Sequence, residues 1–247
     1  MNILVCISKV PDTTSKIAFT DGDTKFNTQG VTWIVNPSDE WYALVRALEI
    51  KESLGAGNVT IITVGPAEDD AVIRKALAVG ADNAVRVNLD PKDSYSVAAA
   101  IADYAKTQNF DLILTGKETI DHNNSEVGGM VAELLGMEFI SPANKLDING
   151  RTARVESETG GATYVFEAEL PLVLSAAKGM AEQRIPNMKG IMAARTKPIT
   201  VVEPASPHPK VNVVKFELPP AKAGVKLIAP ENTDELVQLL HTEAKVI

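Results

Sequence analysis

DLILTGKETIDHNNSEVGGMVAE, residues 111–133, is the clearest indication of this chain's fold class. It opens on an apolar, β-favouring run that is typical of a strand buried on both faces of a parallel sheet. A polar loop follows and ends in residues 123–125, which favour a helix N-cap, and apolar residues then recur at helical spacing from Val127 to a stop at Gly136. Because open α/β sheets bind ligands where their strands end, this loop predicts a binding site, and its helix N-terminus favours a phosphate.

The same alternation of strand and helix precedes this stretch. Strands are predicted at residues 2–8, 31–35, 59–64 and 84–87, and helices at residues 37–54, 72–79 and 94–106. The first helix has the clearest start signal, with Asn36 as the N-cap, Pro37 at the first helical position, and Asp39 and Glu40 near the positive end of the helix dipole. Repeated βαβ units predict a doubly wound, mostly parallel, Rossmann-like α/β fold.

The pattern changes after residue 140. Asn149-Gly150 is a strong hairpin signal between residues 145–148 and 151–158, and further strands are predicted at 163–168 and 171–175. We therefore expect antiparallel strands at the late end of the sheet.

Beyond residue 175 the regular pattern ends. Residues 176–197 hold three methionines among several cations outside any periodic element, and both core filling and partner docking remain open for them. Residues 198–230 hold seven of the 14 prolines, which predicts an extended arm, followed by a tail helix that begins at Asn232. We divide the chain into an α/β domain, 1–197, and an arm, 198–247, which wraps either another subunit or its own domain.

Composition excludes several classes of protein. With 24 basic and 32 acidic residues the net charge is −8, which disfavours broad nucleic-acid binding. Cys6 is the only cysteine, and His122, His208 and His241 lack metal-ligand spacing, so neither a disulfide nor a metal site is expected. No apolar run approaches the roughly 20 residues of a membrane span, and no signal peptide precedes the first strand. We expect a cytoplasmic protein with no membrane insertion.

No motif for catalysis is present. Gly116-Lys117 lacks the spacing of a Walker phosphate loop, and there is no nucleophile elbow or metalloprotease motif. Asp121 beside His122 is the only acid–base pair of note, and a loop pair of this kind is more often solvated. The chain is therefore not expected to be an enzyme.

Several segments in order carry a family resemblance. They include LVCISKVPDT (4–13), VNPSDEWYALVRALEIKE (35–52), VGPAEDDAVIRKALAVGAD (64–82) and AEQRIPNMKGIMAARTKPI (181–199). With them, the chain resembles the beta subunit of electron transfer flavoproteins. The resemblance implies a heterodimer with an alpha subunit, which holds most of the redox FAD. It implies an electron carrier between acyl-CoA dehydrogenase-type donors of fatty acid oxidation and a quinone oxidoreductase.

The resemblance also implies a structural AMP in this chain. Carried over by position, its cradle comprises Cys6 (through its backbone), Asn36, Pro37, Ser38, Asp39, Val64, Thr115, Gly116, Lys117, Thr119, Ile120, Asp121, Asn123, Asn124, Ser125 and Glu126. Thr13 stands where family members often place an aromatic residue near the flavin. These positions lie at strand ends or helix starts, where the residue pattern by itself also predicts a phosphate site.

The resemblance further implies a docking loop for partner proteins, which maps onto residues 181–195. Its members are Arg184, Ile185, Pro186, Met188, Lys189, Ile191 and Met192, with Met188 at the position of the anchor that enters a pocket of the dehydrogenase. Glu158 matches a glutamate that restrains the mobile flavin domain; the alternative is an ordinary turn carboxylate.

Three rival interpretations stay open. Residues 10–13 and Val127-Gly128 also resemble the electron-bifurcating branch, in which a second FAD replaces AMP, whereas Asn123-Asn124 departs from that branch. A stand-alone nucleotide-binding module is the second rival, and a nucleotide-cleaving enzyme is the third.

Overall fold

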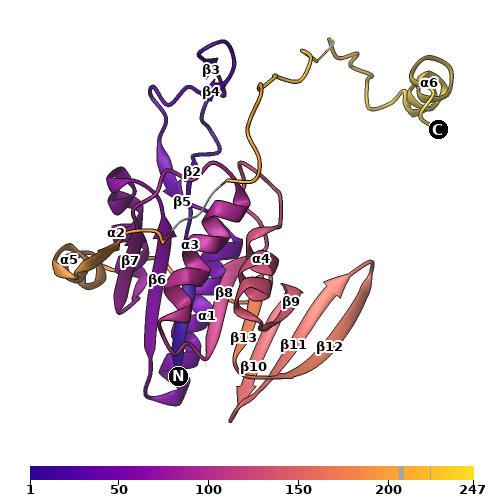
Figure 1. The fold of residues 1–247 in the computed structure, drawn as a ribbon. Coiled ribbons are helices and arrows are strands. Elements are labelled where there is room, and N and C mark those ends of the chain that lie inside the picture. The colour runs from indigo at the N-terminus through magenta and orange to yellow at the C-terminus, as the bar shows by residue number, and fades with distance from the viewer. Residues whose placement is uncertain (206–208, 223) are drawn as a thin grey trace.

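The centre of the molecule is a seven-stranded sheet in which all strands run parallel (Figure 1). The computed structural model describes residues 1–205, 209–222 and 224–247. The strand order is β14-β7-β6-β1-β8-β13-β9, formed by β14 (Ile199–Val202), β7 (Asn83–Val87), β6 (Asn58–Val64), β1 (Asn2–Cys6), β8 (Leu112–Gly116), β13 (Leu172–Ala176) and β9 (Glu138–Ala143).

Helices cover both faces of this sheet. Helices α1 (Asp39–Leu54) and α2 (Asp70–Val79, after the 3-10 turn η1, Ala67–Asp69) share one core with Ile3 and Val5 of β1. Helices α3 (Ser94–Lys106) and α4 (Val127–Leu135) share the other core with Leu4 and Cys6. Successive residues of β1 thus point into opposite cores, as expected for a strand buried on both faces. The doubly wound α/β fold is confirmed.

The strand order reverses between β1 and β8. The chain passes from β1 to β6 and β7 on one side, and then returns to β8 on the other side of β1. At such a reversal the loops leave the sheet in opposite directions and open a crevice at the carboxyl ends of the two strands. That crevice is the position in this fold best suited to a ligand.

The hairpin predicted around Asn149-Gly150 is confirmed, but its strands do not join the central sheet. β10 (Lys145–Asn149), β11 (Thr152–Thr159) and β12 (Ala162–Glu169) form an antiparallel sheet of their own.

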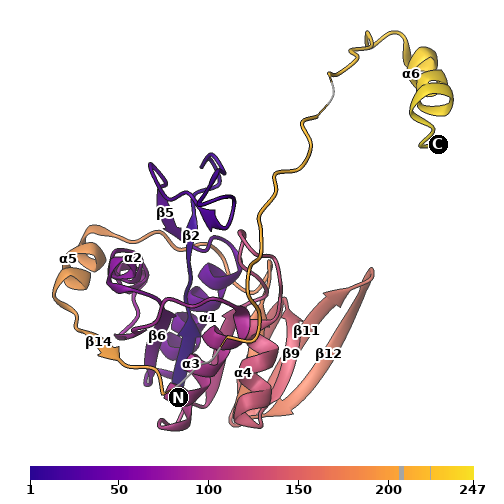
Figure 2. The same ribbon diagram turned by 45° about the horizontal axis from the view of Figure 1, so that its top comes forward.

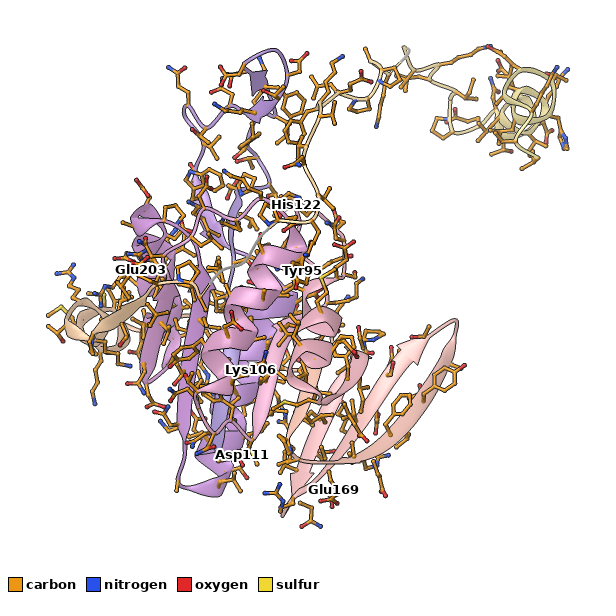
Figure 3. The ribbon with its side chains drawn as sticks, viewed as in Figure 1. Tyr95, Lys106, Asp111, His122, Glu169 and Glu203 are labelled. Carbon is orange, nitrogen blue, oxygen red and sulfur yellow. The ribbon has the colours of Figure 1, made fainter. Side chains whose placement is uncertain are left out.

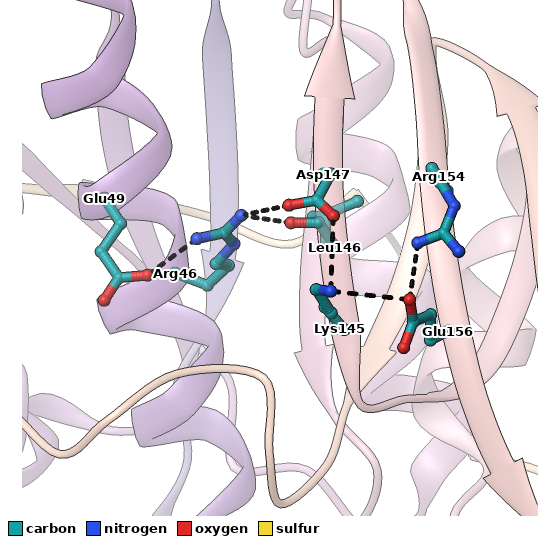
Figure 4. Close-up of polar contacts among 7 residues, drawn as sticks. All are labelled: Arg46, Glu49, Lys145, Leu146, Asp147, Arg154 and Glu156. Carbon is teal, nitrogen blue, oxygen red and sulfur yellow. Dashed lines mark hydrogen bonds and ion pairs between the residues drawn. The ribbon is translucent and has the colours of Figure 1, made fainter. Parts of the chain in front are cut away.

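Arg46 of α1 links this small sheet to the main domain (Figure 4). Its guanidinium donates to the Leu146 carbonyl of β10 and lies 2.9 Å from Glu49 and 3.4 Å from Asp147. Buried Leu146, Ala153 and Val155 belong to the core that α1 and α2 share, so the packing continues from one sheet to the other.

Four short strands lie outside both sheets. β2 (Lys9–Pro11) pairs antiparallel with β5 (Trp33–Val35), and β3 (Phe19–Thr20) pairs with β4 (Lys25–Phe26). The strand predicted at 31–35 therefore exists, as β5, but its predicted place in the central parallel sheet was wrong. It pairs with β2, the short strand that follows β1 in the chain.

The late part of the chain is more regular than predicted. Residues 188–196 form helix α5 (Met188–Thr196), capped by the Asn187 side chain, which accepts a hydrogen bond from the Gly190 amide at 2.8 Å. Strand β9 had no prediction. Strand β14 lies within the segment predicted as an arm, and it forms the edge of the central sheet beside β7.

Beyond Val202, the described residues leave the sheet. The chain runs to helix α6 (Thr233–Leu239), which follows Asn232 as predicted and continues into a π-type turn, η2 (Leu240–Ala244). Neither element contains a buried residue, and in both Figure 1 and Figure 2 α6 stands away from the α/β domain.

Candidate functional site

The predicted adenylate residues converge on the crevice between β1 and β8. Cys6 is the last residue of β1, Thr115 and Gly116 end β8, and Val64 ends the neighbouring β6. The loop 117–126 leaves β8 and leads into α4, while the segment that opens α1 lies beside it, as the contacts of Asn36 show. Residues distant in sequence thus lie at one edge of the sheet.

Asn36 ties the two loops together. Its side chain is fully buried; it donates to the Glu118 carbonyl at 2.9 Å and accepts from the Ile120 amide at 3.1 Å. The prediction of Asn36 as N-cap was wrong, because α1 begins at Asp39 after Ser38, and Pro37 precedes the helix. The amide bridges two loops rather than capping its own helix, which local sequence signals could not reveal.

Two helix N-termini at this edge lack side-chain caps. Ser38 before α1 and Glu126 before α4 make no capping hydrogen bond. The prediction that residues 123–125 cap α4 was wrong: the Ser125 hydroxyl donates to the Glu118 carboxylate at 3.1 Å, and Ser125 has a left-handed φ of 55°. First-turn N–H groups without a side-chain cap remain for solvent or for an anion.

The crevice walls are closely packed at two glycines. A Cβ on Gly116 would lie 2.7 Å from Cγ of Glu40, and one on Gly128 would lie 2.7 Å from Oγ1 of Thr115. Any larger residue would push α1 or α4 away from the end of β8. These glycines therefore set how near both helix N-termini approach the strand.

The charges at the site are mostly acidic. Lys117 is the only cation among the predicted cradle residues, and it pairs with Glu118 at 3.2 Å; its hydrogen bond lowers the pKa of that carboxyl. Burial raises the pKa of Asp39, and Asp121 and Glu126 add further carboxyl groups. A phosphate here would be bound by backbone N–H groups more than by cations.

The sequence reasoning missed the role of Glu40. We interpreted this residue as a favourable charge at the helix start, yet it is 4% exposed and accepts hydrogen bonds from the Ser8 amide at 2.6 Å and the Ser8 hydroxyl at 2.7 Å. Burial raises the pKa of Glu40 to about 8. Burial, and then Glu40 itself, raises the pKa of the Cys6 thiol, so the sole cysteine stays protonated.

Asp121 and His122 lie in the exposed part of the loop, with 3.8 Å between the carboxylate and Nε2. His122 is labelled in Figure 3. No group of three possible metal-ligating side chains occurs among the described residues, and His208 lies outside them. None of the helices in the described ranges is long and apolar enough to cross a membrane.

The predicted docking residues lie on and just before α5. Met188 and Met192 are 73% and 59% exposed one turn apart, and Ile185 is 82% exposed. Arg184 fixes the entry to the helix through a two-bond contact with Glu52 at 2.7 and 3.0 Å. Met180, by contrast, is buried and fills the core.

Helix α5 is held rigidly from behind. A Cβ on Gly190 would lie 2.3 Å from the Ala78 carbonyl of α2, so the two helices are in close contact. Arg74 of α2 donates to the carbonyls of Ala194 and Lys197 at the far end of α5. The exposed methionines therefore project from a fixed support.

Glu158 and Thr13, the two residues expected to face the flavin or its domain, belong to other elements than α5. Glu158 lies in β11 on the side of the molecule opposite α5 (Figure 1), its amide donates to the Asn144 side chain at 2.8 Å, and its carboxylate has no ion pair with a described residue. Thr13 is exposed in the turn after β2.

Comparison with known proteins gives a consistent match. The family model of the electron transfer flavoprotein domain matches residues 23–207. Electron transfer flavoprotein subunit beta from Bacillus subtilis (strain 168) is 39% identical over 261 residues, covering 100% of each chain. The subunit beta from Syntrophomonas wolfei is 38% identical over 92% of this chain and 90% of the relative. The mitochondrial subunit beta from Oryza sativa is 34% identical over 100% of both.

Proposed function

Because this chain belongs to the electron transfer flavoprotein family, as a beta subunit, we propose that it pairs with an alpha subunit and binds AMP at the crevice between β1 and β8. The observation that carries the proposal is the pair of uncapped helix N-termini, α1 and α4, at the topological switch point. The adenylate phosphate would be held by first-turn amides of α4 and by the loop 117–126. The AMP supports assembly and takes no part in turnover.

The redox group of the complex is FAD, which the alpha subunit holds for the most part. When bound, it would accept and release the electrons; this chain's residues would form the scaffold around it, and Thr13 would lie on the flavin side. Electrons would come from acyl-CoA dehydrogenase-type donors and pass to a quinone oxidoreductase, with the flavin domain moving between partners.

Helix α5 would dock the donor. Met188 and Met192 offer flexible apolar side chains on a fixed support, with Lys189 beside them. One buried side chain of this size contributes about 1.5–3 kcal/mol, which suits a contact that must release. Glu158, at the other edge, would restrain the flavin domain when no donor is docked.

Cofactor extraction from the heterodimer, co-expressed and purified intact, tests the proposal. Equal amounts of FAD and AMP are expected by chromatography and mass spectrometry after denaturation. Two FAD and no AMP would favour the bifurcating alternative, which residues 10–13 and Val127-Gly128 suggested. A heterodimer without bound purine would overturn the site.

Variants locate the nucleotide. Asn36→Ala removes both contacts that join the crevice loops and is expected to lower bound AMP. Asn83→Ala is the matched control, since Asn83 is an exposed asparagine at the amino end of β7. Equal AMP in both variants would remove Asn36 from the site.

A further inference from the structure

The Asp93 carboxylate serves two distant parts of the chain. One oxygen accepts the Ser96 amide at 2.8 Å and, with the Ser96 side chain, completes a capping box at the start of α3. The other oxygen accepts the backbone amides of Lys210 at 2.5 Å and Val211 at 2.9 Å. A single side chain thus joins the first turn of α3 to the C-terminal segment.

Neighbouring groups strengthen this junction. The Lys210 ammonium lies 5.1 Å from the ring centroid of Tyr95, which is in the first turn of α3, next to Ser96. Tyr95 is labelled in Figure 3. Burial raises the pKa of Asp93, but hydrogen bonds from Ser96, Lys210 and Val211 outweigh it and lower that pKa to about 2. The carboxylate is therefore ionised at neutral pH, and charge-assisted hydrogen bonds of this kind are stronger than neutral ones.

A second anchor lies six residues further along. The Phe216 amide donates to the Asp23 carbonyl at 2.7 Å, and the Phe216 ring stacks on Phe19 with 5.0 Å between centroids and 12° between planes. Phe19 belongs to β3, so residues 210–216 run from α3 to the β3–β4 hairpin. After Phe216 the described residues up to α6 are mostly exposed, and α6 itself buries nothing.

We propose that residues 210–216 are a strap, and that Asp93 is the positioning residue that fixes it to the domain. The strap sets the direction in which the C-terminal segment leaves, and so presents α6, with half-exposed Leu236 and Val237, to the subunit with which the chain assembles. Fixing the base of a tethered segment raises the effective concentration of its end near that partner. The strap is intramolecular and does not depend on the adenylate site.

Asp93→Asn separates the two roles. The asparagine oxygen still caps α3. Its NH2 group replaces the oxygen that accepted the amides of Lys210 and Val211, and because all of these groups are donors, both hydrogen bonds to the strap are lost. Asp93→Ala removes both the cap and the strap contact. Asp103→Asn makes the same charge change on α3, at a surface ion pair 3.9 Å from Lys106, and serves as the matched control.

Hydrogen exchange of the full chain, read by mass spectrometry, tests the strap. Asp93→Asn is expected to speed exchange in peptides covering 209–217 by about tenfold or more, with exchange across 94–106 unchanged. Asp93→Ala speeds exchange in both regions, and Asp103→Asn in neither. The proposal would be overturned if residues 209–217 exchanged in Asp93→Asn at the same rate as in the wild-type protein. It would also be overturned if these residues were already fully exchanged in the wild-type protein at the first time point.

A distance measurement gives a second reading. Spin labels can be placed at Asn83→Cys and Asn232→Cys, because the native Cys6 is buried and its thiol stays protonated. The strap predicts that Asp93→Asn broadens the distribution of distances between the labels. Equal distributions with and without Asp93→Asn would show that the strap does not direct the segment.

Discussion

Replacing Glu40 with glutamine should abolish a pH dependence of stability. The folded chain raises the pKa of this carboxyl from 4.5 to about 8, chiefly by burial. Between these values the folded state keeps a proton that the unfolded state has released. The protonated Glu40 carboxyl therefore makes its full contribution to the free energy of unfolding below about pH 4.5. This contribution is lost as the pH rises through about 8.

The magnitude follows from the size of the shift. One pKa unit corresponds to about 1.4 kcal/mol, so the slope approaches that value per pH unit and the whole loss is roughly 5 kcal/mol. Glutamine has the shape of the protonated acid. Its oxygen can accept from the Ser8 amide and its NH2 group can donate to the Ser8 hydroxyl, which preserves both contacts. The variant should match the wild type below about pH 4.5 and exceed it by a growing margin up to about pH 8, beyond which the difference levels off.

Urea unfolding of the full chain at several pH values between about 5 and 9, followed by Trp33 and Trp41 fluorescence, measures this difference. Glu133→Gln, at an exposed position of α4, is the control and should show no such trend. A stability difference between Glu40→Gln and wild type that stays constant with pH would refute the reasoning. So would a variant that loses stability as the pH rises.

Three further substitutions probe helix α5 and, on the opposite side of the molecule, Glu158. Met188→Ala should slow reduction of the flavin by a donor, with a loss of up to about 1.5–3 kcal/mol and unchanged FAD content; an unaltered stopped-flow rate would remove Met188 from the interface. Gly190→Ala forces a Cβ against Ala78 and should lower stability by about 1–3 kcal/mol in urea; wild-type stability would contradict the close helix contact. Glu158→Ala should widen the flavin domain's distribution in small-angle scattering of the heterodimer, and an unchanged profile would leave Glu158 an ordinary carboxylate.

Sequence patterns predicted the elements whose signals are local. The strand at residues 112–116 and the helix at 94–106 appear where apolar spacing placed them, because both lie in the middle of the fold and bury a regular pattern. The two edge strands behaved differently. β9 contains Pro142 and β14 follows Pro198, and edge strands tolerate prolines that argue against a central strand.

The arrangement of the candidate site was predicted only in outline. Strand ends indicated which residues would come together, since parallel strands bring their carboxyl ends to one edge of the sheet. The bridging role of Asn36 and the burial of Glu40 depend on loops more than 30 residues away, and no local preference encodes such contacts. Helix α5 escaped prediction because its largest apolar side chains face solvent, so the spacing that marks a buried helix face is absent.

The outermost strand of the small sheet, β12, has a consequence for handling the protein. Within residues 1–205, 209–222 and 224–247, no strand pairs with one of its edges, and Tyr164, Val165 and Phe166 are each at least 42% exposed. An unpaired strand edge of this kind has free N–H and C=O groups with which a strand of a second molecule can pair, and many aggregates begin in this way. Expressed without a partner subunit that covers this edge, the chain should aggregate at high concentration, and Val165→Lys should keep it in solution.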